Sequence, residues 1–79
     1  MSGGLSLTLS SLDARVLRAT DPFRERTVGR VARLADCSED LAGSSLRRLR
    51  GWMLVEPDGC RSTGWLRTRE GDVALEHQP

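Results

Sequence analysis

Apolar residues recur at helical spacing in four stretches of the chain, and a serine or threonine stands directly before each stretch. A hydroxyl at that position can accept a hydrogen bond from the first turn of a helix. The pattern therefore predicts four helices that begin after Ser10, Thr27, Ser38 and Thr68. The first is expected to end at Thr20-Asp21-Pro22, because the residue before a proline avoids helical geometry.

The apolar face of each of the first three predicted helices gives the expected core. Its positions are Leu12, Val16 and Ala19, then Val28, Val31, Ala32, Leu34 and Ala35, and then Ala42, Leu46, Leu49 and Met53. At about 100° per residue, Asp40, Ser44, Arg47 and Gly51 fall on the opposite side of the third helix, flanked by Arg48. The last helix is predicted to be short.

The remaining pattern predicts a β-hairpin and an N-terminal arm. Leu54-Val55-Glu56 is typical of a strand, residues 57–59 of a turn, and residues 64–68 of a returning strand. In residues 1–10, leucines alternate with small or polar residues, which is typical either of a short edge strand or of a loose arm.

Length and composition indicate one small domain. The 79 residues divide into the arm at 1–10, a domain at 11–76 and a tail at 77–79. No apolar run approaches the ~18 residues of a membrane span, and the N-terminus lacks the basic start and apolar stretch of a signal peptide. We therefore expect a cytoplasmic protein with no membrane partner.

Candidate chemistry is sparse. The two cysteines, Cys37 and Cys60, are far apart, and His77 is the single histidine, whereas a zinc site needs four ligands at short paired spacings. The sequence has no recognisable catalytic pair and no phosphate-binding glycine loop. We expect no metal, no cofactor and no enzymatic activity, and we interpret Cys37 as a buried free thiol.

The distribution of charge along the chain says more about possible partners than the net charge does, which is only +1. Six arginines lie between residues 44 and 69, at positions 47, 48, 50, 61, 67 and 69, while acidic residues gather at 36–40 and 70–76. Arginine suits bidentate contacts to phosphate and guanine. All twelve basic residues are arginines, a bias that we attribute first to the codons of a GC-rich bacterial or phage genome.

A tight turn between two helices, followed by a hairpin, is the pattern of a helical core with a wing. Residues 27–38 resemble the first half of a bacterial winged helix-turn-helix motif, and residues 39–56 are similar to its recognition helix running into the wing. The family's ending (a strand, threonine, two residues, glycine and a short helix) is similar to residues 65–71. The resemblance implies a mainly α fold with a small β-hairpin: a tri-helical core, a wing and a short C-terminal helix.

The resemblance also implies sequence-specific binding of double-stranded DNA and transcriptional regulation in bacteria or phages. A recognition helix at about 39–51 would enter the major groove, and a wing at about 57–64 would touch the backbone or the minor groove. Arg47 is the leading contact in this interpretation. The candidate DNA-binding residues are Ser44, Arg47, Arg48, Arg61, Ser62 and Thr63, with Arg48 and Arg61 placed on phosphates. A homodimer is expected, because palindromic operators mirror two-fold symmetry.

A protein-interaction module is the alternative, for example a small phage protein that acts on a host protein without binding DNA. Glu39 and Asp40 put negative charge at the end of the predicted recognition helix that approaches phosphate, and Asp36 adds to this acidic patch. Asp36 also stands where the family favours glycine, although aspartate tolerates left-handed geometry. Gly43, inside the helix at a cost of ~1 kcal/mol relative to alanine, either permits a close backbone approach or marks relaxed selection.

Overall fold

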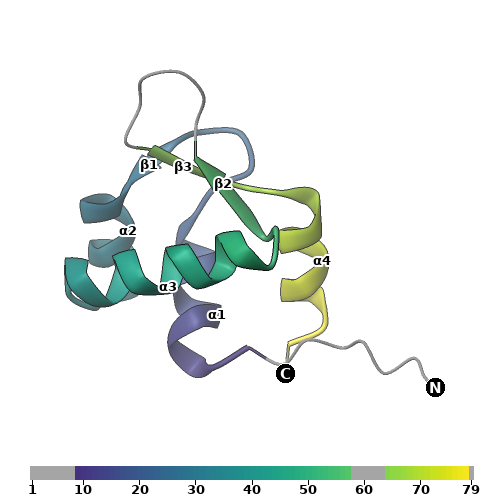
Figure 1. The fold of residues 1–79 in the computed structure, drawn as a ribbon, viewed down its shortest axis with the longest axis horizontal. Helices are drawn as coiled ribbons and strands as arrows, with labels where there is room; N and C mark the ends of the chain where they lie inside the picture. Colours follow the sequence, from purple (N-terminus) through teal and green to yellow (C-terminus); the bar gives the residue numbers. More distant parts are fainter. Residues whose placement is uncertain (1–8, 58–63, 79) are drawn as a thin grey trace.

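The computed structural model describes residues 9–57 and 64–78, which form four helices and three short strands (Figure 1). In chain order these are α1 (Ser11–Ala19), β1 (Arg26–Thr27), α2 (Val28–Ala35), α3 (Glu39–Gly51), β2 (Val55–Pro57), β3 (Gly64–Arg67) and α4 (Arg69–Glu76). The predicted fold class, mainly helical with a small antiparallel β-element, is confirmed. The order of elements is compatible with a winged helix.

All four predicted helix caps are present. Each cap hydroxyl accepts a hydrogen bond from the backbone N–H three residues later, which satisfies one of the amides that a helix leaves unpaired in its first turn. The accepting oxygens belong to Ser10, Thr27, Ser38 and Thr68, at distances of 3.0, 3.2, 3.2 and 3.0 Å. Short local signals therefore determine where these helices begin, and α1 ends as predicted, with Thr20 in an extended conformation.

The turn between α2 and α3 depends on a left-handed residue. Asp36 has a φ of 59° and a ψ of 52°, a conformation that glycine, asparagine and aspartate adopt at less cost than other residues. The next amide, the N–H of Cys37, donates to the carbonyl oxygen of Ala32 at 3.0 Å and so closes the end of α2. The expectation that aspartate preserves this turn is confirmed.

The sheet is antiparallel and has the strand order β1-β3-β2. The hairpin register pairs Val55 with Arg67 and Pro57 with Trp65, and β1 adds a pair between Arg26 and Trp65. The sequence predicts the hairpin but not β1, because two residues are too few to show the alternation of a strand. Through β1, the sheet joins the segment before α2 to the strand that follows the wing.

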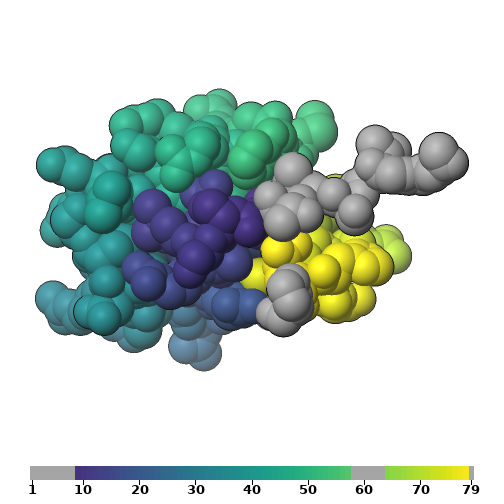
Figure 2. Space-filling view, turned by 90° about the horizontal axis from the view of Figure 1, so that it is seen from below, coloured from purple at the N-terminus to yellow at the C-terminus, as the bar shows by residue number. Residues whose placement is uncertain are grey.

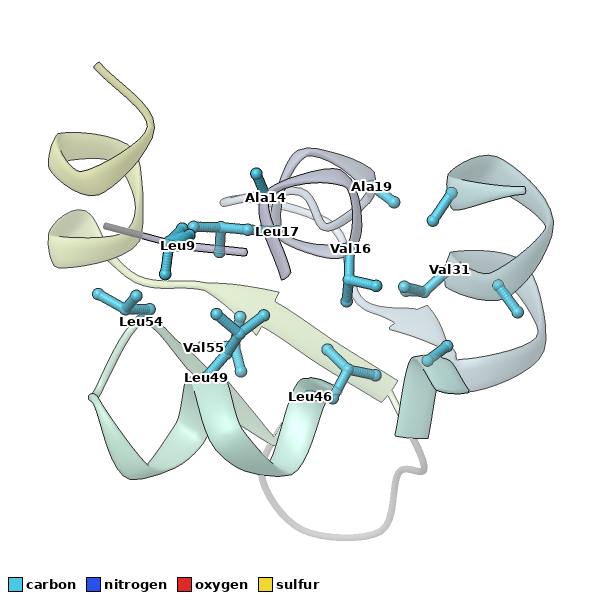
Figure 3. Packing of buried hydrophobic residues seen from close by; sticks show 13 residues of the cluster. Leu9, Ala14, Val16, Leu17, Ala19, Val31, Leu46, Leu49, Leu54 and Val55 are labelled. Atoms are coloured by element: carbon cyan, nitrogen blue, oxygen red, sulfur yellow. The ribbon is translucent and has the colours of Figure 1, made fainter. Parts of the chain in front are cut away.

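The core lies between α1, α2, α3 and the sheet (Figure 3). Leu9 and Leu54 lie at the end of this core near α4. The largest fully buried apolar side chains are Leu17, Leu46, Leu49, Val16, Val31 and Val55. Most of them lie on the helix faces that the apolar periodicity predicts, because side chains at helical spacing share one face.

Two residues predicted to lie in the core are exposed, Leu34 by 50% and Met53 by 73%. In α2 the buried residues are Val31, Ala32 and Ala35, and at ~100° per residue Leu34 lies about a quarter of a turn or more from the centre of that face. Met53 follows the end of α3 and has a φ of 62°, so the helical spacing of the preceding residues does not extend to it. Both predictions were therefore wrong for local geometric reasons.

Thr68 and Gly71 dock α4 against the chain that follows α3. The Thr68 hydroxyl donates to the carbonyl oxygen of Met53 at 2.7 Å, and the Thr68 N–H donates to that of Leu54 at 3.0 Å. A Cβ atom on Gly71 would collide with the same Leu54 carbonyl oxygen. The absence of a side chain at Gly71 is thus what lets the backbone of α4 approach so closely.

The two ends of the described chain lie side by side (Figure 1), where the N–H of Leu9 donates to Oε1 of Gln78 at 3.3 Å. Figure 2 shows α1 on the adjoining face, between α2 on one side and α4 on the other. The proposed arm falls mostly on residues 1–8, outside the described ranges. Within those ranges, no helix is both long enough and apolar enough to cross a membrane.

Candidate nucleic-acid interface

The inner flank of α3 is fully packed. Ala42, Ser45, Leu46 and Leu49 are all 0% exposed, and α3 contacts both α1 and α2. This packing holds the 13-residue helix against the core and leaves its other side facing solvent. Helix α3 therefore presents its outer residues from a supported position.

The outer flank of α3, which we define as Asp40, Ser44, Arg47 and Gly51, follows the sequence prediction. Asp40, Arg47 and Gly51 are exposed, and Ser44 is half-buried. Among residues 9–57 and 64–78, Arg47 takes part in no ion pair. Its guanidinium is therefore available to an external anion or to the edge of a base.

Arg48 has a partner inside the protein. Its Nη2 donates to Oδ1 of Asp13 at 2.8 Å, and its Nε donates to Oδ2 of the same carboxylate at 3.3 Å. The Ser45 hydroxyl donates to Asp13 Oδ1 at 2.6 Å. These three residues, the Asp13 cluster, join α1 to α3, so the guanidinium predicted to contact phosphate is engaged within the protein.

Asp13 is buried, at 3% exposure, and remains ionised because of its neighbours. Burial acts to raise the pKa of Asp13, but the hydrogen bonds from Arg48 and Ser45 and the charge of Arg48 outweigh it, so the net pKa is lowered. The hydrogen bond to Asp13 in turn raises the pKa of Arg48. The cluster is thus a charged link between two helices.

The acidic residues at the start of α3 differ in their surroundings. A Cβ atom on Gly29 would lie 3.3 Å from Oε2 of Glu39, so the Glu39 carboxylate rests over the first turn of α2. Negative charge is favoured there, because the amides of a helix N-terminus carry partial positive charge. Asp36, Glu39 and Asp40 are all exposed to solvent, so the acidic patch at this end of α3 is accessible.

Gly43 is not required for a close approach of α3 to α2. A Cβ atom added to Gly43 would lie 3.8 Å from Cγ2 of Val28, an ordinary van der Waals separation. Packing among the described residues therefore does not require glycine at position 43.

The wing is described only at its base. Pro57 ends β2 and Gly64 begins β3, whereas the candidates Arg61, Ser62 and Thr63 lie outside the described residues, as does Cys60. Arg67 supports the return strand: its Nη1 donates to the carbonyl oxygen of Leu17 at 3.1 Å, and its Nε lies 2.7 Å from Oδ1 of Asp72. The pair with Asp72 joins the return strand to the last helix.

Metal-ligand chemistry is sparse in the described part of the chain. Residues 9–57 and 64–78 contain no group of three or more histidine, cysteine, aspartate or glutamate side chains placed to hold a metal ion. Cys37 is a free thiol and is half-buried, less buried than predicted. The exposed outer flank of α3 is one surface that the described residues offer to a partner.

Comparison with known proteins returns no relatives: no family model, no curated protein and no solved structure matches the chain.

Proposed function

We propose that the chain binds double-stranded DNA through the outer flank of α3 and regulates transcription. The observation that supports this proposal is the position of Arg47. It is exposed, takes part in no ion pair among the described residues, and lies on a helix whose opposite side is fully packed. A helix held in this way has the diameter to enter a major groove, and arginine can contact both guanine and phosphate there.

The residues have separate roles in this proposal. Arg47 makes the leading contact, and Ser44, half-buried beside it, makes a short hydrogen bond. Arg48 positions α3 through its pair with Asp13, and its side chain, 47% exposed, keeps N–H donors that can contact a phosphate, as the sequence predicts. Arg61, Ser62 and Thr63 remain the predicted wing contacts to the backbone or the minor groove.

Fluorescence anisotropy of a labelled GC-rich duplex at several salt concentrations tests the proposal. We expect binding that weakens steeply as salt rises, because each neutralised phosphate releases counterions. Arg47→Ala should weaken binding about tenfold, and if Arg47 contacts phosphate the slope of log K against log salt falls by about 0.9. Circular dichroism establishes that the variant is folded.

Two arginine variants serve as controls. Arg15 is exposed on α1, outside the proposed interface, so Arg15→Ala should leave affinity and salt slope close to those of the wild type. Arg48→Ala should weaken binding and reduce the salt slope less than Arg47→Ala does, because the Arg48 guanidinium is paired with Asp13. Equal losses for Arg15→Ala and Arg47→Ala would mean that general charge, and not α3, binds the duplex.

The exposed acidic residues Asp36 and Asp40 favour the second candidate, an interaction module for a protein partner. They form an acidic patch at the end of α3, next to the arginine on its outer flank, which suits a polar protein interface. Absence of duplex binding even at low salt, where non-specific contacts are strongest, would exclude the DNA proposal and leave this one.

A further inference from the structure

The strand order places β1 and β2 at opposite edges of the sheet, and each edge borders a surface hollow. The hollow at β1 has a volume of about 270 Å³, and the hollow at β2 about 490 Å³. The outer-flank residues Ser44 and Arg47 line neither of them. The two hollows are therefore separate from the outer flank of α3, although Pro57, at the base of the predicted wing, lines the β2 hollow.

Just before β1, an ordered turn presents a phenylalanine to solvent. Phe23 is 90% exposed, yet its N–H and that of Arg24 donate to Oδ1 of Asp21 at 2.8 and 3.0 Å. Arg26 adds a bond of 2.8 Å from its Nη1 to the carbonyl oxygen of Ala19. Because the backbone of the turn is already held, docking Phe23 against a partner costs little further ordering.

The hollow lined by Arg24, the residue that follows Phe23, is mostly basic. Three arginines, one glutamate and one threonine line the β1 hollow: Arg24, Arg26, Arg30, Glu25 and Thr27. Arg26 is paired with Asp21, whereas Arg24 and Arg30 are exposed. We call Phe23, Arg24 and Arg30 the β1 knob: an exposed aromatic side chain, the arginine that follows it in the chain, and a second arginine that lines the same hollow as Arg24.

The hollow at the other edge has the opposite character. Met53, Val55 and Pro57 supply apolar surface, and two glutamates, one arginine and one threonine complete the lining: Glu56, Glu70, Arg50 and Thr68. Met53 is 73% exposed and holds a left-handed conformation with a φ of 62°, which costs a non-glycine residue about 1–2 kcal/mol. We call this surface the β2 hollow.

We propose that the β1 knob of one molecule docks into the β2 hollow of a second copy of this chain. Phe23 would lie against Met53, and Arg24 and Arg30 would face Glu56 and Glu70. The argument is complementarity in two respects, an exposed aromatic with an apolar hollow and a basic surface with an acidic one.

The positions of the two surfaces determine the form of the assembly. Because the knob and the hollow lie at opposite edges of one sheet, the contact is head-to-tail, and each added molecule keeps one surface available. The expected product is a growing chain of subunits rather than the two-fold dimer that a palindromic operator suggests. We expect this contact to be weak and to form at micromolar to millimolar concentration.

Sedimentation equilibrium over a concentration series tests the proposal with wild type and two variants. Phe23→Ser removes the aromatic side chain of the knob, and the bonds to Asp21 that hold the turn survive because they come from backbone N–H groups. Met53→Gly combined with Glu56→Arg removes the apolar wall and reverses a charge of the hollow, while glycine suits the left-handed position. Circular dichroism verifies that each variant is folded.

We expect the average mass of the wild type to rise well above 8.7 kDa with concentration, and each variant alone to stay at the monomer mass. An equimolar mixture should form pairs of about twice that mass and no longer chains, because the Phe23→Ser molecule keeps its hollow and the other keeps its knob. The proposal is overturned if the wild type stays monomeric at about 1 mM, if either variant associates like the wild type, or if the mixture stays monomeric. None of these outcomes depends on whether DNA binds.

Discussion

The two sides of α3 carry the same residue types at adjacent positions, yet these residues have different surroundings. Ser45 and Arg48 bond to the buried carboxylate of Asp13, whereas Ser44 and Arg47 lie on the outer flank, where Arg47 takes part in no ion pair with the described residues. A step of one residue, ~100° around the helix, separates a side chain that anchors α3 from one that faces solvent. The comparison teaches that the arginines of a helix that already have partners inside the protein must be identified before any arginine is assigned as a ligand contact.

The largest effect is expected from removing the carboxylate that distinguishes the two sides. Asp13→Ala leaves the buried Ser45 hydroxyl without its acceptor and Arg48 without its partner, and should lower the free energy of unfolding by about 2–3 kcal/mol. Urea denaturation measures the loss. The matched control is Asp40→Ala, an exposed carboxylate on the outer flank, for which we expect a change of about 0.5 kcal/mol or less. Equal losses in the two variants would refute the assigned role of the Asp13 cluster.

Acid should remove part of the same stabilisation. The pKa of Asp13 is lower in the folded protein than its ordinary value, so its contribution is present above about pH 4 and is lost as the pH falls through the folded-state pKa. The unfolding free energy of the wild type should therefore fall on acidification, and that of Asp13→Ala should fall less. Phe23's N–H lowers the pKa of Asp21 as well, so the variant retains some acid sensitivity. Parallel pH profiles would contradict the prediction.

The adjacent serines provide a smaller and closely matched comparison. Replacing either serine by alanine improves helix propensity by a similar few tenths of a kcal/mol, but Ser45→Ala also removes a buried hydrogen bond to a carboxylate. We expect Ser45→Ala to be less stable than Ser44→Ala by about 1.5 kcal/mol. Thermal and urea unfolding of both variants give the difference, and equal stabilities would show that the bond to Asp13 adds nothing.

The smallest expected effect is a gain in stability when Gly43, a glycine of α3, is replaced. Gly43→Ala should raise the free energy of unfolding by about 0.5–1 kcal/mol, because the added methyl group meets Val28 at an ordinary contact distance. Gly71→Ala is the opposing control, since its methyl group would collide with the carbonyl oxygen of Leu54. A loss of stability in Gly43→Ala would mean that α3 packs more tightly against α2 than the described geometry allows.

Features that depend on neighbouring residues could be predicted from the sequence. The hydroxyl caps, the end of α1 and the left-handed turn at Asp36 each follow from the chemistry of a few consecutive residues. The strand β1 could not be predicted, because its two residues become a strand only by pairing with β3. Met53 was assigned to the core because the helical period was extended past the end of α3.

The candidate site also has a part that could be predicted from the sequence and a part that could not. Helical spacing correctly placed Ser44 and Arg47 on the outer side of α3. It did not reveal that Arg48 pairs with Asp13, because the two residues are 35 positions apart and periodicity carries no information about long-range partners. One signal was present: Asp13 shares the helical face of the buried Val16 and Leu17, where an acidic residue requires a partner.

The hydrogen bond between Leu9 and Gln78 holds the two ends of the described chain together, so the distance between these ends reports whether the domain is folded. The folded molecule has a Cα radius of gyration of 12.0 Å, whereas an unfolded chain of this length has one of about 27 Å. Fluorophores attached near residues 9 and 78 would therefore transfer energy efficiently while the domain is folded and much less when it unfolds. Such a labelled protein would report the denaturation of every variant above by one optical signal, without a label on α3 or at either edge of the sheet.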